Sequence, residues 1–454
     1  MIRITFLTAV VIFSACSFAP TGNAAAANIK LTKAEHVGMS TERLEHIGET
    51  MRSLIREQKI PGTVTLVARR GRVVHFEASG LRDVARALPM EKDTIFRLYS
   101  QSKPVTGVAV MMLFEEGHFL LNDPISKYLP EFAEMEVYIG MQDGKMMTEP
   151  ARPITIHQLL THTSGLTYDY LPTTVGAMYR DNGVVGSVSL ADSPEEGMTA
   201  ASSADSMGSS GLRQWSEKLS KMPLVAQPGD QWNYSVSMDV LGRLVEVISG
   251  KSFGEFLQQR IFGPLQMNDT GFYVPEAKLE RFAANYSPAA PNGGLTLLDD
   301  PSTSPYRNPP SIEMGGSGLV GTVPDYLQFA QMLANRGEFA GKRLIGRKTV
   351  EFMMSNHMTS AIGEDPLTSL QATLGSGRSW GIGFGITGSV VTNPAIAGLP
   401  VSPGTYGWGG AATTHFWVDL EEQLVGIVHT QLLPDGTYPV RELMQVTTYQ
   451  ALID

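Results

Sequence analysis

The 454-residue sequence predicts an α+β fold, in which helices flank an antiparallel sheet and a second, all-helical lobe is inserted. Short β-type runs gather near both ends of the chain, whereas the middle carries mostly helical patterns. The length also exceeds the range in which a single hydrophobic core keeps growing, so two lobes are expected. We assign residues 31–97 and 336–454 to a discontinuous α/β lobe and residues 98–335 to the helical lobe, with approximate boundaries.

The first folded segment predicts a helix followed by two strands. Ser40 can cap this helix, and the run ends at Pro61. Residues 64–68 and 73–78 then read as strands that are joined by a turn. The apolar residues that recur at nearly helical period in the first segment are Leu44, Ile47, Met51, Leu54 and Ile55.

The rest of the chain follows the same division. Helices are expected at 105–116, from 123, and at 154–160, 238–248, 253–261, 325–335 and 348–355. Residues 173–211 are rich in Ser, Gly, Ala and Asp, as in a long surface loop that could cover a site. Glycine-punctuated β runs follow at 381–385, 414–418 and 423–429, and a final helix is expected at 440–452.

Composition limits the function classes. The chain is 43% hydrophobic and 18% charged, which is typical of a folded protein. Its net charge of −10, without a dense run of Lys and Arg, argues against a nucleic-acid-binding surface.

The N-terminal residues predict export. Residues 1–27 read as a signal peptide, with Arg3 before an apolar run at 4–15 and four alanines at 24–27. Cys16, the one cysteine of the chain, follows that run and could instead be a lipid-anchor site. The mature protein, residues 28–454, is therefore expected in the periplasm or outside the cell, without a disulfide, metal or organic cofactor.

The most informative motif is the tetrapeptide Ser-Gln-Ser-Lys at 100–103. Residues three apart share a helix face, so the Lys103 amine can reach the Ser100 hydroxyl and activate it as a nucleophile. The motif also lies at a predicted helix start, where free backbone N–H groups favour developing negative charge.

Two further segments supply what such a nucleophile needs. Tyr234 stands on a turn before a helix and can relay protons. The run Tyr-Gly-Trp-Gly-Gly-Ala at 406–411 precedes a β run, and small residues on an edge strand let a substrate approach the backbone. One N–H of this run, with that of Ser100, could form an oxyanion hole.

Together these segments resemble the serine β-lactamase and penicillin-binding-protein superfamily, closest to its class C branch and to the family VIII carboxylesterases. The runs 159–166 and 315–319 are similar to two further signatures of that branch, and the order is the family's. The resemblance implies a β-lactamase-like two-lobe fold and Ser100 as the nucleophile. It implies Lys103 and Tyr234 as the base pair and the N–H groups of Ser100 and Ala411 as the oxyanion hole. His162, inside one signature, is expected to support packing.

Two departures from the class C pattern bear on the substrate. Trp408, Gly409 and Gly410, the expected substrate-binding residues, replace a Lys-Thr-Gly whose lysine helps to hold a substrate carboxylate. Val236 stands where that branch has an asparagine. Both changes favour a neutral ester and resemble the esterase branch. Arg378 could replace the missing cation, which leaves lactamase activity open.

A competing nucleophile is Ser379, in a Gly-x-Ser-x-Gly run that is followed by Asp419 and His429. That motif requires a helix directly after the serine. The residues after Ser379 are instead β-like, and Asp419 and His429 are too close in sequence for an intervening helix. The Ser100 assignment is therefore preferred.

The leading hypothesis is a serine hydrolase that cleaves short-chain carboxylic esters through an acyl-enzyme on Ser100. A class C-like β-lactamase or D,D-peptidase is the second, and a non-catalytic penicillin-binding envelope protein is the third. Each would take a small ester or β-lactam-like ligand, and the sequence leaves the oligomeric state open.

Overall fold

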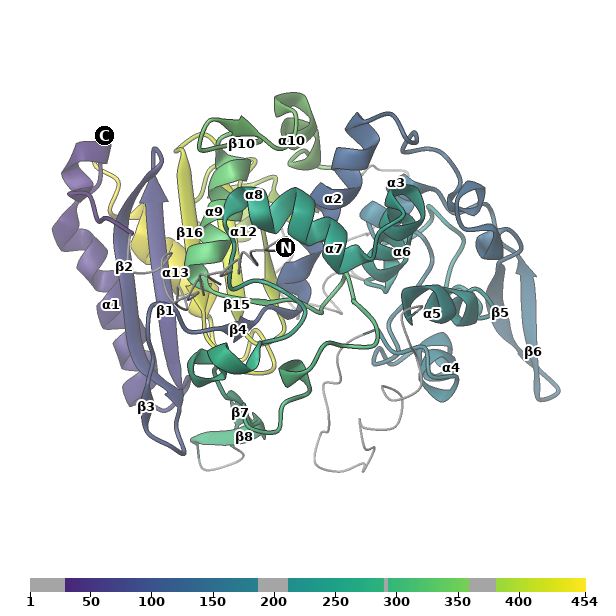
Figure 1. Cartoon of the computed structure of the whole chain (residues 1–454), viewed down its shortest axis with the longest axis horizontal. Helices are drawn as coiled ribbons and strands as arrows, with labels where there is room; N and C mark the ends of the chain where they lie inside the picture. The colour runs from purple at the N-terminus through teal and green to yellow at the C-terminus, as the bar shows by residue number, and fades with distance from the viewer. Residues whose placement is uncertain (1–28, 187–210, 290–292, 359–380) are drawn as a thin grey trace, which may run out of the picture.

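The structure is a computed structural model that describes residues 29–186, 211–289, 293–358 and 381–454. Within these ranges, eight strands form one antiparallel sheet in the order β12-β13-β14-β15-β16-β1-β2-β3. The strands from the beginning of the chain lie beside those from its end (Figure 1). Their bounds are Gly62–Arg69 (β1), Arg72–Asp83 (β2), Leu88–Pro89 (β3), Ile382–Phe384 (β12), Ser389–Val391 (β13), Tyr406–Gly410 (β14), Thr414–Asp419 (β15) and Leu424–His429 (β16).

Helices cover both faces of this sheet. Helices α1 (Thr41–Arg56) and α13 (Val440–Tyr449) pack together on one face, and α9 (Val323–Ala334) packs on the other (Figure 1). Successive side chains of a strand point to opposite faces of the sheet, so β1 contributes to the core on each face. Leu66 joins the core on the α9 side, and Val67 joins the core under α1. Every residue of β1 is consequently buried.

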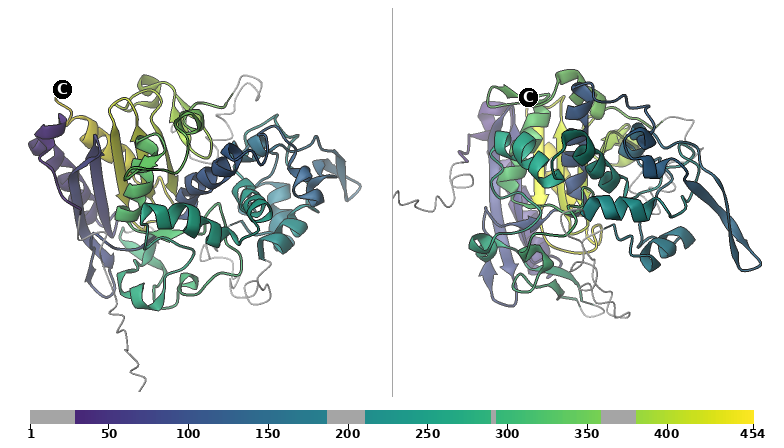
Figure 2. Two further views of the ribbon diagram at one scale, coloured as in Figure 1. Left: turned by 45° about the horizontal axis from the view of Figure 1, so that its top comes forward. Right: turned by 45° about the vertical axis from the view of Figure 1, so that its right-hand side comes forward.

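The middle of the chain forms the helical part of the molecule beside the sheet (Figure 2). Helix α2 is buried along nearly its whole length, because apolar residues cover all of its sides. The helices of this middle part are α2 (Lys103–Glu115), α3 (Ile156–Leu160), α4 (Thr174–Asp181), α5 (Gly211–Leu219), α6 (Ser237–Ser249), α7 (Phe253–Leu257) and α8 (Gly263–Leu265). Two short helices, α10 (Arg347–Met353) and α12 (Pro394–Ala397), follow later in the chain.

Four small two-stranded pairs complete the described structure. The hairpin of β5 and β6 projects from the helical part (Figures 1 and 2), and the sequence patterns did not indicate it because most of its residues are exposed. The pairs are β4 (Phe96–Arg97) with β9 (Val320–Gly321), β5 (Glu136–Gln142) with β6 (Lys145–Pro150), β7 (Asn285–Pro288) with β8 (Leu295–Asp299), and β10 (Glu338–Phe339) with β11 (Lys342–Arg343).

Most predicted elements are confirmed, including the α+β fold class. Ser40 caps α1 by accepting a hydrogen bond from the Arg43 N–H, and the turn between β1 and β2 has left-handed backbone at Arg70 and Gly71.

Three expectations need correction. The expected loop at 173–211 contains helix α4, which Thr173 caps, and its residues 187–210 lie outside the described ranges. The helix expected at 253–261 changes to π geometry from Gln258 onward. The segment after Pro124 forms only a 3-10 turn.

The predicted signal peptide with Cys16, and also Arg378 and Ser379, lie outside the described residues. None of the helices in the described ranges is both long and apolar enough to cross a membrane.

Candidate active site

Ser100 and Lys103 lie where a 3-10 turn at Tyr99–Ser102 continues into helix α2. Tyr99 has a positive φ of 44°, which is uncommon for a residue other than glycine and marks a constrained turn directly before Ser100. The Lys103 Nζ atom donates to Ser100 Oγ at 3.0 Å and to the carbonyl oxygen of Gly316 at 2.7 Å. The structure therefore brings the predicted serine and lysine into direct contact.

Burial changes the protonation of Lys103. Its residue surface is 0% exposed, and desolvation lowers the pKa of the amine to about 7, against the opposing effect of the Asp239 carboxylate. Near neutral pH a substantial fraction of this amine is therefore uncharged, which is the form that can accept a proton.

Tyr234 also contacts Ser100. Its hydroxyl donates to Ser100 Oγ at 2.6 Å, and its ring centroid lies 4.6 Å from Lys103 Nζ. Burial raises the pKa of the Tyr234 phenol, so this group holds its proton over the physiological range. The three predicted residues thus form one hydrogen-bonded set around Ser100 Oγ.

His162 supports the segment that carries Tyr234. Its Nδ1 atom is 3.0 Å from Ser235 Oγ, its carbonyl accepts from the Asn233 N–H at 2.8 Å, and its ring centroid is 5.0 Å from that of Tyr234. Burial, with the nearby Lys103, holds the pKa of His162 well below its usual value. The imidazole is therefore neutral and packs against Tyr234.

Strand β14 forms the side of the site near Trp408. Strand β13 pairs only with Tyr406 and Gly407, so the backbone from Trp408 to Gly410 faces no β13 partner. The expectation of an edge strand holds only for this half, because β14 otherwise lies between β13 and β15. The Trp408 ring packs near those of Tyr234 and Phe384, at centroid distances of 6.0 and 5.3 Å.

The glycines of this strand have different surroundings. A Cβ atom on Gly410 would lie 2.1 Å from the Leu98 carbonyl oxygen, so this close approach to the segment before Ser100 requires glycine. A Cβ atom on Gly409 would instead lie 2.2 Å from His415 Nδ1, on the side of the neighbouring strand β15. Ala411 follows at the turn, where its carbonyl accepts from the Asp435 N–H at 2.7 Å.

Asp239 was not identified from the sequence. It lies in the first turn of α6, five residues after Tyr234, and is completely buried. Its Oδ1 atom accepts from the N–H of Gly316, whose carbonyl holds Lys103. The glycine run 315–319 was singled out as a motif, but no local pattern connects it to an aspartate 77 residues earlier.

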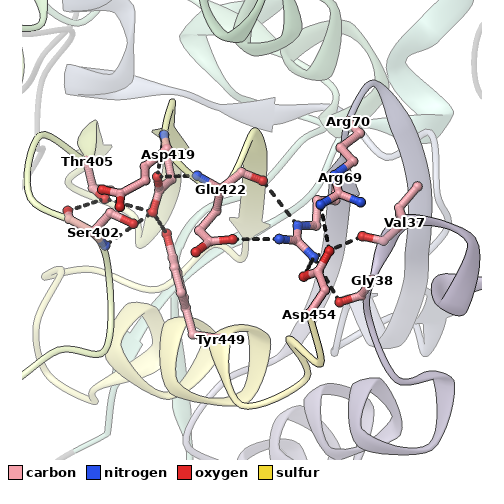
Figure 3. Close-up of polar contacts among 11 residues, drawn as sticks. Val37, Gly38, Arg69, Arg70, Ser402, Thr405, Asp419, Glu422, Tyr449 and Asp454 are labelled. Atoms are coloured by element: carbon pink, nitrogen blue, oxygen red, sulfur yellow. Dashed lines mark hydrogen bonds and ion pairs between the residues drawn. The ribbon is translucent and has the colours of Figure 1, made fainter.

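The alternative triad is not assembled in the described residues. Asp419 pairs with Leu424 at one end of the β15–β16 ladder, and His429 pairs with Thr414 at the other end, about 17 Å away at strand spacing. The Asp419 carboxylate binds Ser402, Thr405, Tyr449 and the backbone at Glu422 (Figure 3). Asp419 is therefore occupied by structural donors.

The described residues also contain no group of three or more His, Cys, Asp or Glu side chains that could hold a metal ion.

The contact of Ser100 with Lys103 and Tyr234 in an α+β fold is the arrangement expected of a serine hydrolase, and comparisons with known proteins identify the family. The Beta-lactamase family model matches residues 45–447. Protein Rv1367c of Mycobacterium tuberculosis is 33% identical, and the match covers 83% of this chain and 87% of that protein. The chain therefore belongs to the Beta-lactamase family. This confirms the resemblance found in the sequence and the prediction of a serine hydrolase.

Two further relatives carry functional names. Esterase EstB of Burkholderia gladioli is 32% identical, with 80% of this chain and 84% of EstB covered. The solved structure of EstCE1, described as a hydrolase with promiscuous acyltransferase activity, has a TM-score of 0.72 and 26% identity. The match covers 90% of this chain and 99% of the EstCE1 chain.

Proposed function

We propose that this protein is a carboxylesterase that hydrolyses short-chain, neutral esters through an acyl-enzyme on Ser100. The observation that carries the proposal is the pair of hydrogen bonds to Ser100 Oγ, from Lys103 Nζ at 3.0 Å and from Tyr234 at 2.6 Å. The named esterase EstB and the hydrolase EstCE1 among its relatives support the ester substrate.

Acylation uses the uncharged amine. Ser100 Oγ attacks the ester carbonyl carbon while its proton passes to Lys103, and a tetrahedral intermediate forms. The backbone N–H groups of Ser100 and Ala411 stabilise its oxyanion. When the bond to the alcohol oxygen breaks, the proton returns from Lys103 through the Tyr234 hydroxyl to the departing alcohol, and the acyl group remains on Ser100.

Deacylation repeats these steps with water. As water attacks the acyl carbonyl, one of its protons passes through the Tyr234 hydroxyl to Lys103. Ser100 Oγ then leaves and regains that proton from Lys103 as the acid departs. Since the base must be uncharged and burial lowers the pKa of Lys103 to about 7, the rate should rise with pH through this value.

An aromatic cluster next to Tyr234 favours a neutral substrate. The Trp408 ring lies 6.0 Å from that of Tyr234 and 5.3 Å from that of Phe384. Trp408 and Val236 also lack the charged amine and the amide with which class C lactamases recognise a carboxylate and an amide. A small acyl group and an uncharged alcohol match such a site better than a β-lactam does.

β-Lactam hydrolysis is the second candidate, because the family model that matches the chain is that of the β-lactamases. Its acylation would use the same three residues. Hydrolysis of a chromogenic cephalosporin as fast as that of an ester would favour it over the esterase proposal.

The test compares two serines. Ser100→Ala should abolish hydrolysis of p-nitrophenyl butyrate, since it removes the nucleophile, and Ser379→Ala should leave most of the activity. Melting temperatures of both variants control for folding. The reverse pattern of activity would overturn the assignment of Ser100.

A further inference from the structure

Gly316 connects two buried ionisable side chains. Its carbonyl oxygen accepts from Lys103 Nζ at 2.7 Å, and its N–H donates to Asp239 Oδ1 at 2.9 Å. Lys103 and Asp239 are both 0% exposed and come from different helices, α2 and α6. The position of the amine against Ser100 therefore depends on a backbone residue that the carboxyl group of Asp239 holds.

The contacts of Asp239 are incomplete. Its Oδ2 atom is buried without a hydrogen-bond partner in the described structure, and the same is true of the Tyr168 hydroxyl. Leaving a buried carboxylate oxygen unpaired is costly, so a purely structural role would be better served by an apolar side chain. Asp325 Oδ1 is unpaired in the same way, so the feature that distinguishes Asp239 is its hydrogen bond to the backbone residue that holds Lys103.

A side chain at Gly316 would crowd the two unpaired groups. A Cβ atom would lie 3.0 Å from the Tyr168 hydroxyl and 3.1 Å from Asp239 Oδ2. Glycine lets the carboxyl group of Asp239 and the phenol of Tyr168 approach the backbone that holds the lysine.

We propose that Asp239 is a positioning residue for the Ser100–Lys103 pair, which fixes the amine through the Gly316 backbone and supplies its buried counter-charge. The proposal rests on the assigned role of Ser100 as nucleophile. It adds an acidic group to the site, and this group sets the pH range in which Lys103 is uncharged.

The direction of this effect follows from charge. The Asp239 carboxylate favours the charged form of Lys103 and so raises the pKa of an amine that burial lowers. Burial in turn raises the pKa of Asp239, against the Gly316 N–H and Lys103, which lower it. The other titratable groups with an electrostatic effect on this pair or close to it are His162, Tyr168, Asp169, Tyr170 and Tyr234.

The test measures how fast a fluorophosphonate labels Ser100 as a function of pH, followed by intact-protein mass. This readout needs only the nucleophile and its base, not the physiological substrate. Asp239→Asn keeps an acceptor for the Gly316 N–H but removes the charge. The acid limb of its labelling profile should therefore move about one pH unit lower than in the wild type, since an opposite charge shifts a pKa by roughly one to three units.

Asp325→Asn is a matched control. Asp325 is also completely buried in the first turn of a helix, and burial raises its pKa to about 7, but it contacts Asp269 and Thr270 instead of the site. Its labelling profile should coincide with that of the wild type.

Asp239→Ala and Gly316→Ala distinguish the effect of Asp239 on the position of Lys103 from the effect of its charge. Both disturb the backbone that holds Lys103, so the labelling rate at high pH should fall at least tenfold, whereas Asp239→Asn should keep most of it. An acid limb in Asp239→Asn that matches the wild type would overturn the proposal. Absence of labelling in the wild type would instead refute Ser100 as the nucleophile, so the two failures are distinguishable.

Discussion

Asp239 and Asp419 are both completely buried aspartates, but their surroundings differ. Asp419 accepts hydrogen bonds from the Tyr449 hydroxyl at 2.7 Å, from Thr405, and from the N–H groups of Ser402, Glu421 and Glu422 (Figure 3). Asp239 accepts from the Gly316 N–H, keeps one oxygen unpaired in the described structure, and faces the buried amine of Lys103.

The different partners of these two aspartates indicate a role in stability for Asp419 and a role at the active site for Asp239. Five donors bind the carboxylate of Asp419 and connect the end of β15 to helix α13, so its hydrogen bonds are structural. Asp239 stays responsive to the charge of its neighbour, because few fixed donors compete with Lys103. Burial alone therefore does not identify a functional carboxylate; its partners do.

Apart from the nucleophile itself, the largest effect on activity is expected at Tyr234, which belongs to the same site as Asp239. Tyr234→Phe removes the proton relay but keeps the ring, so the kcat for an ester should fall by about 10²- to 10⁴-fold, the usual contribution of general acid–base catalysis. Melting temperature should change little. A variant with near wild-type kcat would exclude Tyr234 from proton transfer.

The largest effect on stability is expected at Asp419. Asp419→Ala leaves five donors without their acceptor, so the free energy of unfolding should fall by about 3 kcal/mol or more, as for a broken buried network. Denaturant unfolding measures this loss. The kcat of the folded variant should remain close to wild type, and a selective loss of kcat would revive Asp419 as a catalytic candidate.

Asp325 gives a smaller, pH-dependent effect on stability. Burial raises its pKa to about 7 in the folded state, whereas an unfolded aspartate has a pKa of 3.8. The folded state therefore holds a proton that the unfolded state releases, and the stability from this group is present below pH 4 and lost as pH rises through about 7. Asp325→Asn should reduce the fall in melting temperature between pH 5 and pH 8. An unchanged slope would contradict the raised pKa.

The smallest effect is expected at Tyr168. Its hydroxyl has no hydrogen-bond partner in the described ranges, so Tyr168→Phe should change the free energy of unfolding by less than about 1 kcal/mol. Ester hydrolysis should stay within a few-fold of wild type. A large loss of kcat would place the phenol, with Asp239, in direct support of Lys103.

The sequence was sufficient for the motifs that carry local signals. Ser100 and Lys103 are three residues apart, so helical geometry alone predicts their contact, and period and capping predict helix α1 from Ser40 onward. The contact of Tyr234 with Ser100 spans 134 residues and came from the family resemblance.

Asp239 could not be predicted in the same way. It belongs to a buried helix with an apolar face, and its role depends on Gly316, 77 residues away. The hairpin of β5 and β6 also escaped prediction, since mostly exposed strands lack the alternation that marks a half-buried strand. Long-range packing decides such features, and local composition does not report it.

The central claim is that Ser100 carries the acyl group of a hydrolysed ester. Intact-protein mass after rapid quenching with p-nitrophenyl butyrate, followed by peptide mapping, tests it most directly. The account predicts a transient butyryl adduct on the peptide that contains Ser100, which is absent in Ser100→Ala and longer-lived in Tyr234→Phe. An adduct on any other residue, or steady hydrolysis by Ser100→Ala, would contradict it.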